Sequence, residues 1–152
     1  MSTVFMYNIY EGSRNMRILG IDYGDARVGV AVTDLLGITA QGVKTIKNTG
    51  RKQLLAELSA IIGEYKPEKI VIGLPKNMDG TSGFRAEATY KFAEALKTIY
   101  SGEVVFYDER LSTMGAARFL NETNTRGAKR KKVLDTVSAC IILEGYMMSE
   151  KR

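Results

Sequence analysis

Two short apolar runs joined by a polar turn lie near the start of the chain. Residues 18–21 and 28–32 are almost wholly apolar, and the segment Tyr23-Gly24-Asp25 between them has the composition of a hairpin turn. Residues 37–47 carry apolar positions among more polar ones, which favours a third strand at an edge of the sheet. Consecutive hairpins of this kind predict an antiparallel meander.

The rest of the chain alternates between helical and strand patterns. Residues 51–65 place leucines and isoleucines three and four positions apart, which predicts an amphipathic helix that Pro67 ends. The further elements expected are strands over 69–73 and 104–107 and helices over 84–100, 112–120 and 133–148. The side chains expected to face inward from the second of these helices are Phe84, Ala88, Phe92, Ala95, Leu96 and Ile99.

The resulting order, βββαβαβαα, predicts an α/β fold. Strands joined by helices should pair in parallel through right-handed crossovers, which gives a mixed five-stranded sheet flanked by helices. A length of 152 residues suits one domain. Residues 1–15 show no clear period, so we expect an N-terminal extension, which can be flexible, ahead of a single domain over 16–152.

Composition narrows the chemistry. The chain has no histidine, which excludes histidine zinc sites, Ser-His-Asp triads and histidine general bases. One cysteine, Cys140, cannot form an internal disulfide, and no apolar run approaches the roughly 20 residues of a membrane span. We therefore expect a cytoplasmic protein with no membrane partner. A net charge of +5 permits an anionic partner such as nucleic acid.

Asp22 stands at the end of the first predicted strand, where its neighbours are apolar. A buried carboxylate is costly unless it is paired, hydrogen-bonded or bound to a metal ion. One hypothesis is therefore that Asp22 holds a metal. The alternative is that its side chain caps the hairpin turn.

Two further carboxylates occupy comparable positions. Glu109 follows the last predicted strand, and Asp135 lies in the first turn of the last predicted helix. Since the carboxyl ends of parallel strands meet at the edge where α/β sheets bind ligands, the three groups could converge. Hard oxygen ligands favour Mg²⁺ or Mn²⁺, and two such ions about 4 Å apart can promote phosphodiester cleavage without histidine. Alternatively, Glu109 is a solvated strand end and Asp135 favours the positive end of its helix.

Several cationic and polar residues are candidates for binding phosphate groups near these carboxylates. Arg27 and Arg110 lie close to Asp22 and Glu109 in the sequence. A basic run precedes Asp135 and could bind a nucleic-acid backbone, although a solvated loop is the alternative. The run comprises Arg126, Lys129, Arg130, Lys131 and Lys132, and a polar loop over 74–83 adds Lys76, Asn77 and Thr81.

Four motifs, in one order, together resemble the YqgF/RuvX family of Holliday junction resolvases. They are Gly20-Ile-Asp-Tyr-Gly24 with Arg27 and Gly29-Val-Ala-Val-Thr-Asp34, Ile72-Gly-Leu-Pro-Lys-Asn-Met-Asp-Gly-Thr81, Asp108-Glu-Arg-Leu-Ser-Thr113 and Asp135-Thr-Val-Ser-Ala139. The resemblance covers Met16 to about Met148. It implies an RNase H-like fold and a cytoplasmic bacterial nuclease that acts on branched DNA or on the precursor of small-subunit ribosomal RNA. It also implies that Asp22, Glu109 and Asp135 form the acidic active site.

Three function classes follow from these observations. The first is a metal-dependent endonuclease of the two-metal type, acting on structured nucleic acid. The second is a non-catalytic nucleic-acid-binding module. The third, less favoured, is a phosphoryl-transfer domain of the actin-like and sugar-kinase type, because those proteins enclose a nucleotide between two domains and this chain has room for one. The sequence leaves monomer and homodimer open, although cutting a symmetric junction would ask for a dimer.

Overall fold

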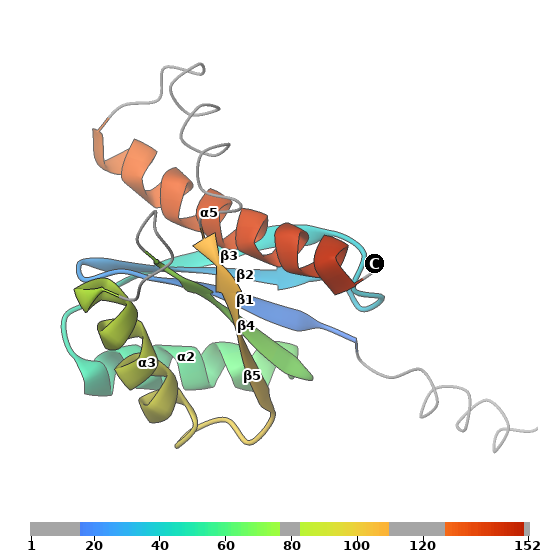
Figure 1. Cartoon of the computed structure of the whole chain (residues 1–152), viewed down its shortest axis with the longest axis horizontal. Helices are drawn as coiled ribbons and strands as arrows, with labels where there is room; N and C mark the ends of the chain where they lie inside the picture. The colour runs from blue at the N-terminus through green and yellow to red at the C-terminus, as the bar shows by residue number, and fades with distance from the viewer. Residues whose placement is uncertain (1–15, 77–82, 110–126, 151–152) are drawn as a thin grey trace, which may run out of the picture.

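A single five-stranded sheet carries helices on both of its faces (Figure 1). The structure, a computed structural model, describes residues 16–76, 83–109 and 127–150, and only the backbone from 127 to 135. The strands are β1 (Ile18–Tyr23), β2 (Arg27–Thr33), β3 (Ala40–Lys47), β4 (Lys69–Leu74) and β5 (Glu103–Asp108). The helices are α2 (Arg51–Tyr65), α3 (Phe84–Leu96) and α5 (Gly127–Glu150).

The strand order is β3-β2-β1-β4-β5. The first three strands form the predicted antiparallel meander, with β3 at an edge. Strand β4 lies between β1 and β5 and is parallel to both. Its central residues Ile70, Val71 and Ile72 are fully buried, as the continuous apolar run of a strand covered on both faces predicts. The mixed α/β sheet expected from the sequence is therefore confirmed.

Side chains alternate between two hydrophobic cores, one on each face of the sheet. Leu19 and Ile21 of β1 pack into the core beneath α2 and α3, whereas Ala31 and Val71 pack into the core beneath α5. Gly20 faces α5, and a side chain there would collide with Leu143 and with the carbonyl oxygen of Ala139. The missing side chain thus lets α5 lie directly against β1.

Helix α5 crosses the sheet from one edge towards the other (Figure 1). Thr136 lies against Gly42 of β3, Leu143 against Gly20 of β1, and Gly145 against Tyr107 of β5. The N-terminal end of α5 lies on the same side of the molecule as the β1–β2 turn, at the left of Figure 1. Within the parts of the chain that are described, no helix combines the length and apolar character that crossing a bilayer requires.

The structure corrects the expected start of the last helix. Helix α5 begins at Gly127, not at Val133, so residues 127–132 are helical and are not part of a loop. Alanine, lysine and arginine are good helix formers, but a search for apolar periodicity does not detect a run of them. Asp135 therefore lies in the third turn of α5. The helix dipole acts mainly in the first turn, so attraction to the positive helix end, which was the alternative explanation, does not account for its position.

The inward face of α3 also differs from the expectation. Phe84 is 81% exposed, and the buried positions are Ala86, Thr89, Phe92, Ala93 and Leu96. The helix ends at Leu96, four residues earlier than expected, and a turn leads to the buried Tyr100. Two alanines and a threonine thus supply much of the packed face, and a pattern based on large apolar residues does not identify them. The expected extension over 1–15 and helix over 112–120 lie outside the described residues.

Candidate active site

Asp22 and Glu109 come from different strands and meet at one edge of the sheet. Asp22 is the second-last residue of β1, and Glu109 directly follows β5. Strand β4 lies between these two strands, and its Gly73 leaves room for the glutamate. A Cβ at Gly73 would lie only 2.6 Å from Oε1 of Glu109, so the glutamate side chain lies against the backbone of β4. The convergence of these two carboxyl groups was predicted from their positions at strand ends.

The two carboxyl groups are hydrogen-bonded to each other. Burial first, and then the negative charges of Asp22 and Asp108, together raise the pKa of Glu109 to about 8. Burial also raises the pKa of Asp22, although the hydrogen bond from Glu109 and the charge of Arg85 oppose that rise. At neutral pH and without a cation, Glu109 therefore keeps its proton and donates a hydrogen bond to the carboxylate of Asp22.

Arg85 is a site residue that the sequence interpretation missed. It is the second residue of α3, and its positive charge lowers the pKa of both Asp22 and Glu109. Arg85 also lines a pocket of about 300 Å³ together with Lys76, one of the predicted substrate-binding residues. The available signal was its position, because the start of a helix that follows a parallel strand lies at the carboxyl edge of the sheet.

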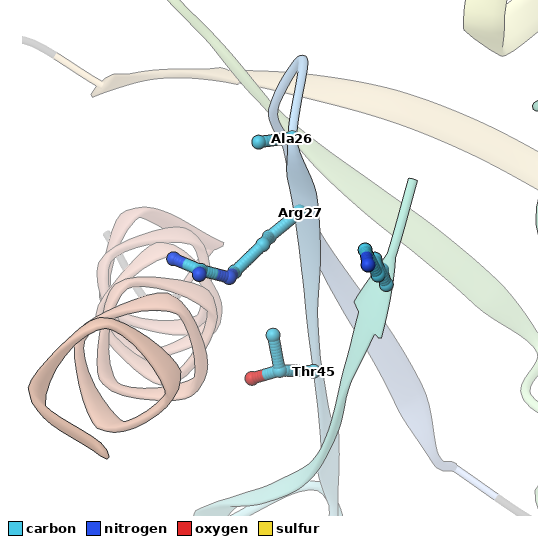
Figure 2. Close-up of a pocket in the computed structure, with 4 residues that line it drawn as sticks. Ala26, Arg27 and Thr45 are labelled. Atoms are coloured by element: carbon cyan, nitrogen blue, oxygen red, sulfur yellow. The ribbon is translucent and has the colours of Figure 1, made fainter. Parts of the chain in front are cut away.

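Arg27 lies on the neighbouring strand and lines a second pocket. This pocket has a volume of about 350 Å³, and its lining residues are Ala26, Arg27, Thr45 and Lys47. Figure 2 shows Arg27 and Thr45 extending to the side of the strands on which a helix lies. Asp22 pairs with Gly29, two positions from Arg27, so the pocket and the carboxyl pair share this face of the sheet.

The remaining predicted site residues are described in part or not at all. Asp135 lies in α5 one turn before Ala139, whose carbonyl oxygen is close to Gly20 of β1. Its side chain lies outside the described part, so its approach to the carboxyl pair stays a prediction. The side chains of Lys129, Arg130, Lys131 and Lys132 in α5 also lie outside the described part of the chain, as do residues Asn77, Arg110 and Arg126. Their roles in binding stay predictions.

The lone thiol does not offer a nucleophile. Cys140 is half-buried in α5, and burial together with the charge of Glu144 raises its pKa to about 11. At neutral pH the side chain is a thiol, whereas nucleophilic cysteines act as thiolates. With no histidine in the chain, the carboxyl pair is the strongest candidate for chemistry among the described residues.

The donor set of this pair suits a magnesium or manganese ion. Both are hard cations, and Mg²⁺ is commonly held by one or two carboxylates together with substrate phosphates. A divalent cation would replace the proton of the hydrogen bond between these two half-buried groups. Within the described ranges, no group of three acidic, cysteine or histidine side chains is arranged to hold a metal ion, and Asp135 is the candidate third ligand from the sequence.

The sequence was compared with protein families and with curated proteins. A family model described as "RuvX: Holliday junction resolvase" matches residues 16–149. A protein of Clostridioides difficile named "Putative pre-16S rRNA nuclease" is 54% identical over 131 residues, covering 86% of this chain and 93% of its own length. A protein of the same name from Bacillus cytotoxicus is 46% identical over 137 residues, which cover 89% of this chain and 100% of that protein.

Solved structures with the same fold include two resolvases bound to junctions. The Thermus thermophilus RuvC in complex with a Holliday junction substrate has a TM-score of 0.53 and 15% identity, covering 87% of this chain and 96% of that one. The Fowlpox virus resolvase in complex with Holliday junction DNA has a TM-score of 0.52 and 12% identity, covering 90% of this chain and 100% of that one. At these identities the similarity shows the RNase H-like fold.

Proposed function

The chain belongs to the RuvX family, and from that premise we propose that it is a metal-dependent endonuclease that hydrolyses phosphodiester bonds in structured nucleic acid. The two substrates under consideration are pre-16S ribosomal RNA and a Holliday junction, which the names of the relatives and of the family suggest. Such a substrate and the lone cysteine favour a cytoplasmic site of action.

One observation carries the proposal. The carboxyl groups of Asp22 and Glu109 are half-buried and hydrogen-bonded to each other at the carboxyl edge of the sheet. Two half-buried carboxyl groups in contact cost folding free energy when both are ionised, so their placement side by side favours a role in binding a cation. No histidine or thiolate competes with this explanation.

The chain's own residues would divide the work as follows. Asp22 and Glu109 would hold the cation, and Asp135 is the third proposed ligand. Once bound, Mg²⁺ or Mn²⁺ would polarise the phosphoryl group and make water a nucleophile at neutral pH; a second ion would stabilise the leaving oxygen. Arg85 would supply positive charge beside the phosphate. The rest of the strand would be held by the basic residues Arg27, Lys76 and Arg110, by the basic run 129–132 and by the amide of Asn77.

The test is cleavage by paired variants. Asp22→Asn and Glu109→Gln keep size and hydrogen bonding but remove the charge that holds the cation. Each should lower the cleavage rate by about 10³-fold or more while the protein stays folded. The assay should use a pre-16S ribosomal RNA fragment and a four-way DNA junction, each with Mg²⁺ and with Mn²⁺. Unchanged cleavage by both variants would reject the assignment.

The same assay separates the proposal from a non-catalytic binding module. A module of that kind would bind RNA or DNA equally well before and after Asp22→Asn and would cleave neither substrate with manganese. A matched control is Glu94→Gln in α3, which removes an exposed carboxylate that pairs with Lys97 at 3.2 Å. This control should cleave as well as the unmodified protein.

A further inference from the structure

Two cations lie directly opposite each other beside the candidate active site. In the antiparallel pairing of β2 with β3, Arg27 is the partner of Lys47, so both side chains leave the same face of the sheet. Like charges placed directly opposite on neighbouring strands destabilise a sheet. Among the side chains that the structure describes, no carboxylate forms an ion pair with either residue. The arrangement thus lacks a purely structural explanation within that part of the chain.

These two residues form the walls of a pocket rather than a flat surface. The pocket has a volume of about 350 Å³, and the hydroxyl-bearing Thr45 and the small Ala26 complete its lining (Figure 2). Two cations and a hydroxyl around a small open cavity suit a tetrahedral oxyanion such as a phosphate group. The charged ends of Arg27 and Lys47 therefore suit the pocket to one phosphate group.

The position of the pocket relates it to the carboxyl pair. Thr45 pairs with Gly29, and Gly29 pairs with Asp22, so the three residues form one row across the sheet on the face that α5 covers. Two strand spacings separate the ends of this row, which amounts to about 10 Å. A phosphate in the pocket would therefore belong to a nucleotide near the one whose phosphate lies at Asp22.

We propose that the pocket between Arg27 and Lys47 is a phosphate-binding subsite that holds the substrate strand close to the scissile bond. The occupant is a backbone phosphodiester of the nucleic acid, and this assignment rests on the proposed function. The subsite positions the strand and takes no part in bond cleavage. Lys47 and Thr45 thereby become substrate-binding residues alongside Arg27.

The first experiment measures binding without cleavage. Affinity for the RNA fragment and for the DNA junction is measured in EDTA over a range of salt concentrations. Lys47→Gln should weaken binding about fivefold at moderate salt and lower the slope of log K against log salt by about 1. The double variant Arg27→Gln, Lys47→Gln should lower this slope by about 2. Lys47→Arg, which keeps the charge, should restore binding.

Lys44→Gln is the matched control. Lys44 lies on the same strand and its replacement changes the net charge equally, but its side chain pairs with Glu57 of α2 at 3.0 Å on the opposite face. It should leave both affinity and slope unchanged. If Lys47→Gln and Lys44→Gln weaken binding equally, the cations act only through net charge and the subsite is rejected.

A second experiment locates the phosphate. DNA junctions that carry a single uncharged methylphosphonate are compared at successive positions around the cleavage site. At one position the replacement should weaken binding of the unmodified protein but leave binding of the double variant Arg27→Gln, Lys47→Gln nearly unaffected. The absence of such coupling at every position would overturn the subsite. If the protein shows this coupling but cleaves neither substrate, the subsite stands and the proposed nuclease function is rejected. If it cleaves but shows no coupling, the nuclease function stands and the subsite is rejected.

Discussion

At the scale of single residues, Glu109 is held in an unusual state. Its folded-state pKa of about 8 lies well above the ordinary value of 4.5, chiefly because the side chain is partly withdrawn from water and next because it lies beside Asp22. Between these two pH values the folded protein keeps a proton that the unfolded chain releases. The free energy of unfolding must therefore fall as pH rises through this range, because the unfolded state binds fewer protons.

Glu109→Gln should remove this fall, because the amide stays neutral at every pH. In EDTA, the unmodified protein should lose roughly 1–3 kcal/mol relative to the variant between about pH 5 and pH 9. Urea unfolding at a series of pH values measures the difference. Mg²⁺ should restore stability at high pH to the unmodified protein and not to the variant. Parallel stability curves in EDTA would contradict the raised pKa.

Arg85 should affect how the cleavage rate rises with pH on the acidic side of its pH profile. Its charge lowers the pKa of both carboxyl groups, so Arg85→Gln should shift the acidic limb to higher pH. Because the residue is exposed, the shift should be only about half a pH unit. The control is Lys91→Gln, an exposed cation of the same helix. If Arg85→Gln changes KM at every pH but does not shift the acidic side of the pH profile, Arg85 acts in substrate binding alone.

The sequence allowed some of these residues to be found and concealed others. Asp22 and Glu109 could be brought together because each stands where a predicted strand ends, and topology alone fixes which strand ends are neighbours. Arg85 of α3 acts through its charge on two carboxyl groups that belong to other elements, and the spacing of residues in the sequence does not reveal such an interaction. Lys47 was not predicted as a binding residue, because a lysine at the end of an edge strand is common. Only the pairing of Lys47 with Arg27 on the neighbouring strand indicates a role.

At the scale of elements, glycines determine how close the layers come. Gly73 of β4 lies beneath both Glu109 and Ile142 of α5, and an added Cβ would lie 2.6 Å from Oε1 of the glutamate and 2.5 Å from Cδ1 of the isoleucine. Both atoms are side-chain tips, which can move at small cost. The fold should therefore tolerate an alanine better than the carboxyl pair does.

Gly73→Ala should reduce cleavage on the order of 100-fold, because the carboxylate is displaced from its partner. The loss of unfolding free energy should stay near or below about 1 kcal/mol. Gly63→Ala in α2 is the control, since nothing lies within 4 Å of its Cβ position. That change should stabilise the protein by about 0.5–1 kcal/mol and leave cleavage unaltered. Equal cleavage by the two variants would show that Gly73 has no part in placing Glu109.

Helix boundaries show where sequence patterns lose information. Helix α2 was predicted over its full length, because its apolar spacing and Pro67 mark both the face and the end. Helix α5 was begun six residues too late, since its first turns consist of lysines, arginine and alanine without an apolar stripe. In α3, Ala86 and Thr89 are buried while Phe84 is exposed, and only the three-dimensional neighbours decide that choice.

At the scale of the whole molecule, charge and chemistry gather at one edge. The carboxyl pair, Arg85 and the pocket at Arg27 all lie where β1, β4 and β5 end, and the chain carries a net charge of +5. A polyanion attracted by the overall charge would thus meet its binding groups and the proposed cation ligands on the same side. Each chain contains a single pair of this kind among its described residues.

A single site per chain makes a prediction about junctions. Resolving a symmetric junction needs two cuts, and one copy of this chain can make only one cut at a time. On a supercoiled plasmid with an extruded cruciform, the protein should first form nicked circles, and linear product should appear only later. Gel electrophoresis over time, at several protein concentrations and with Asp22→Asn as the inactive control, measures both products. Linear product that forms without a nicked precursor would mean that two copies cut together, in which case the active form is a dimer.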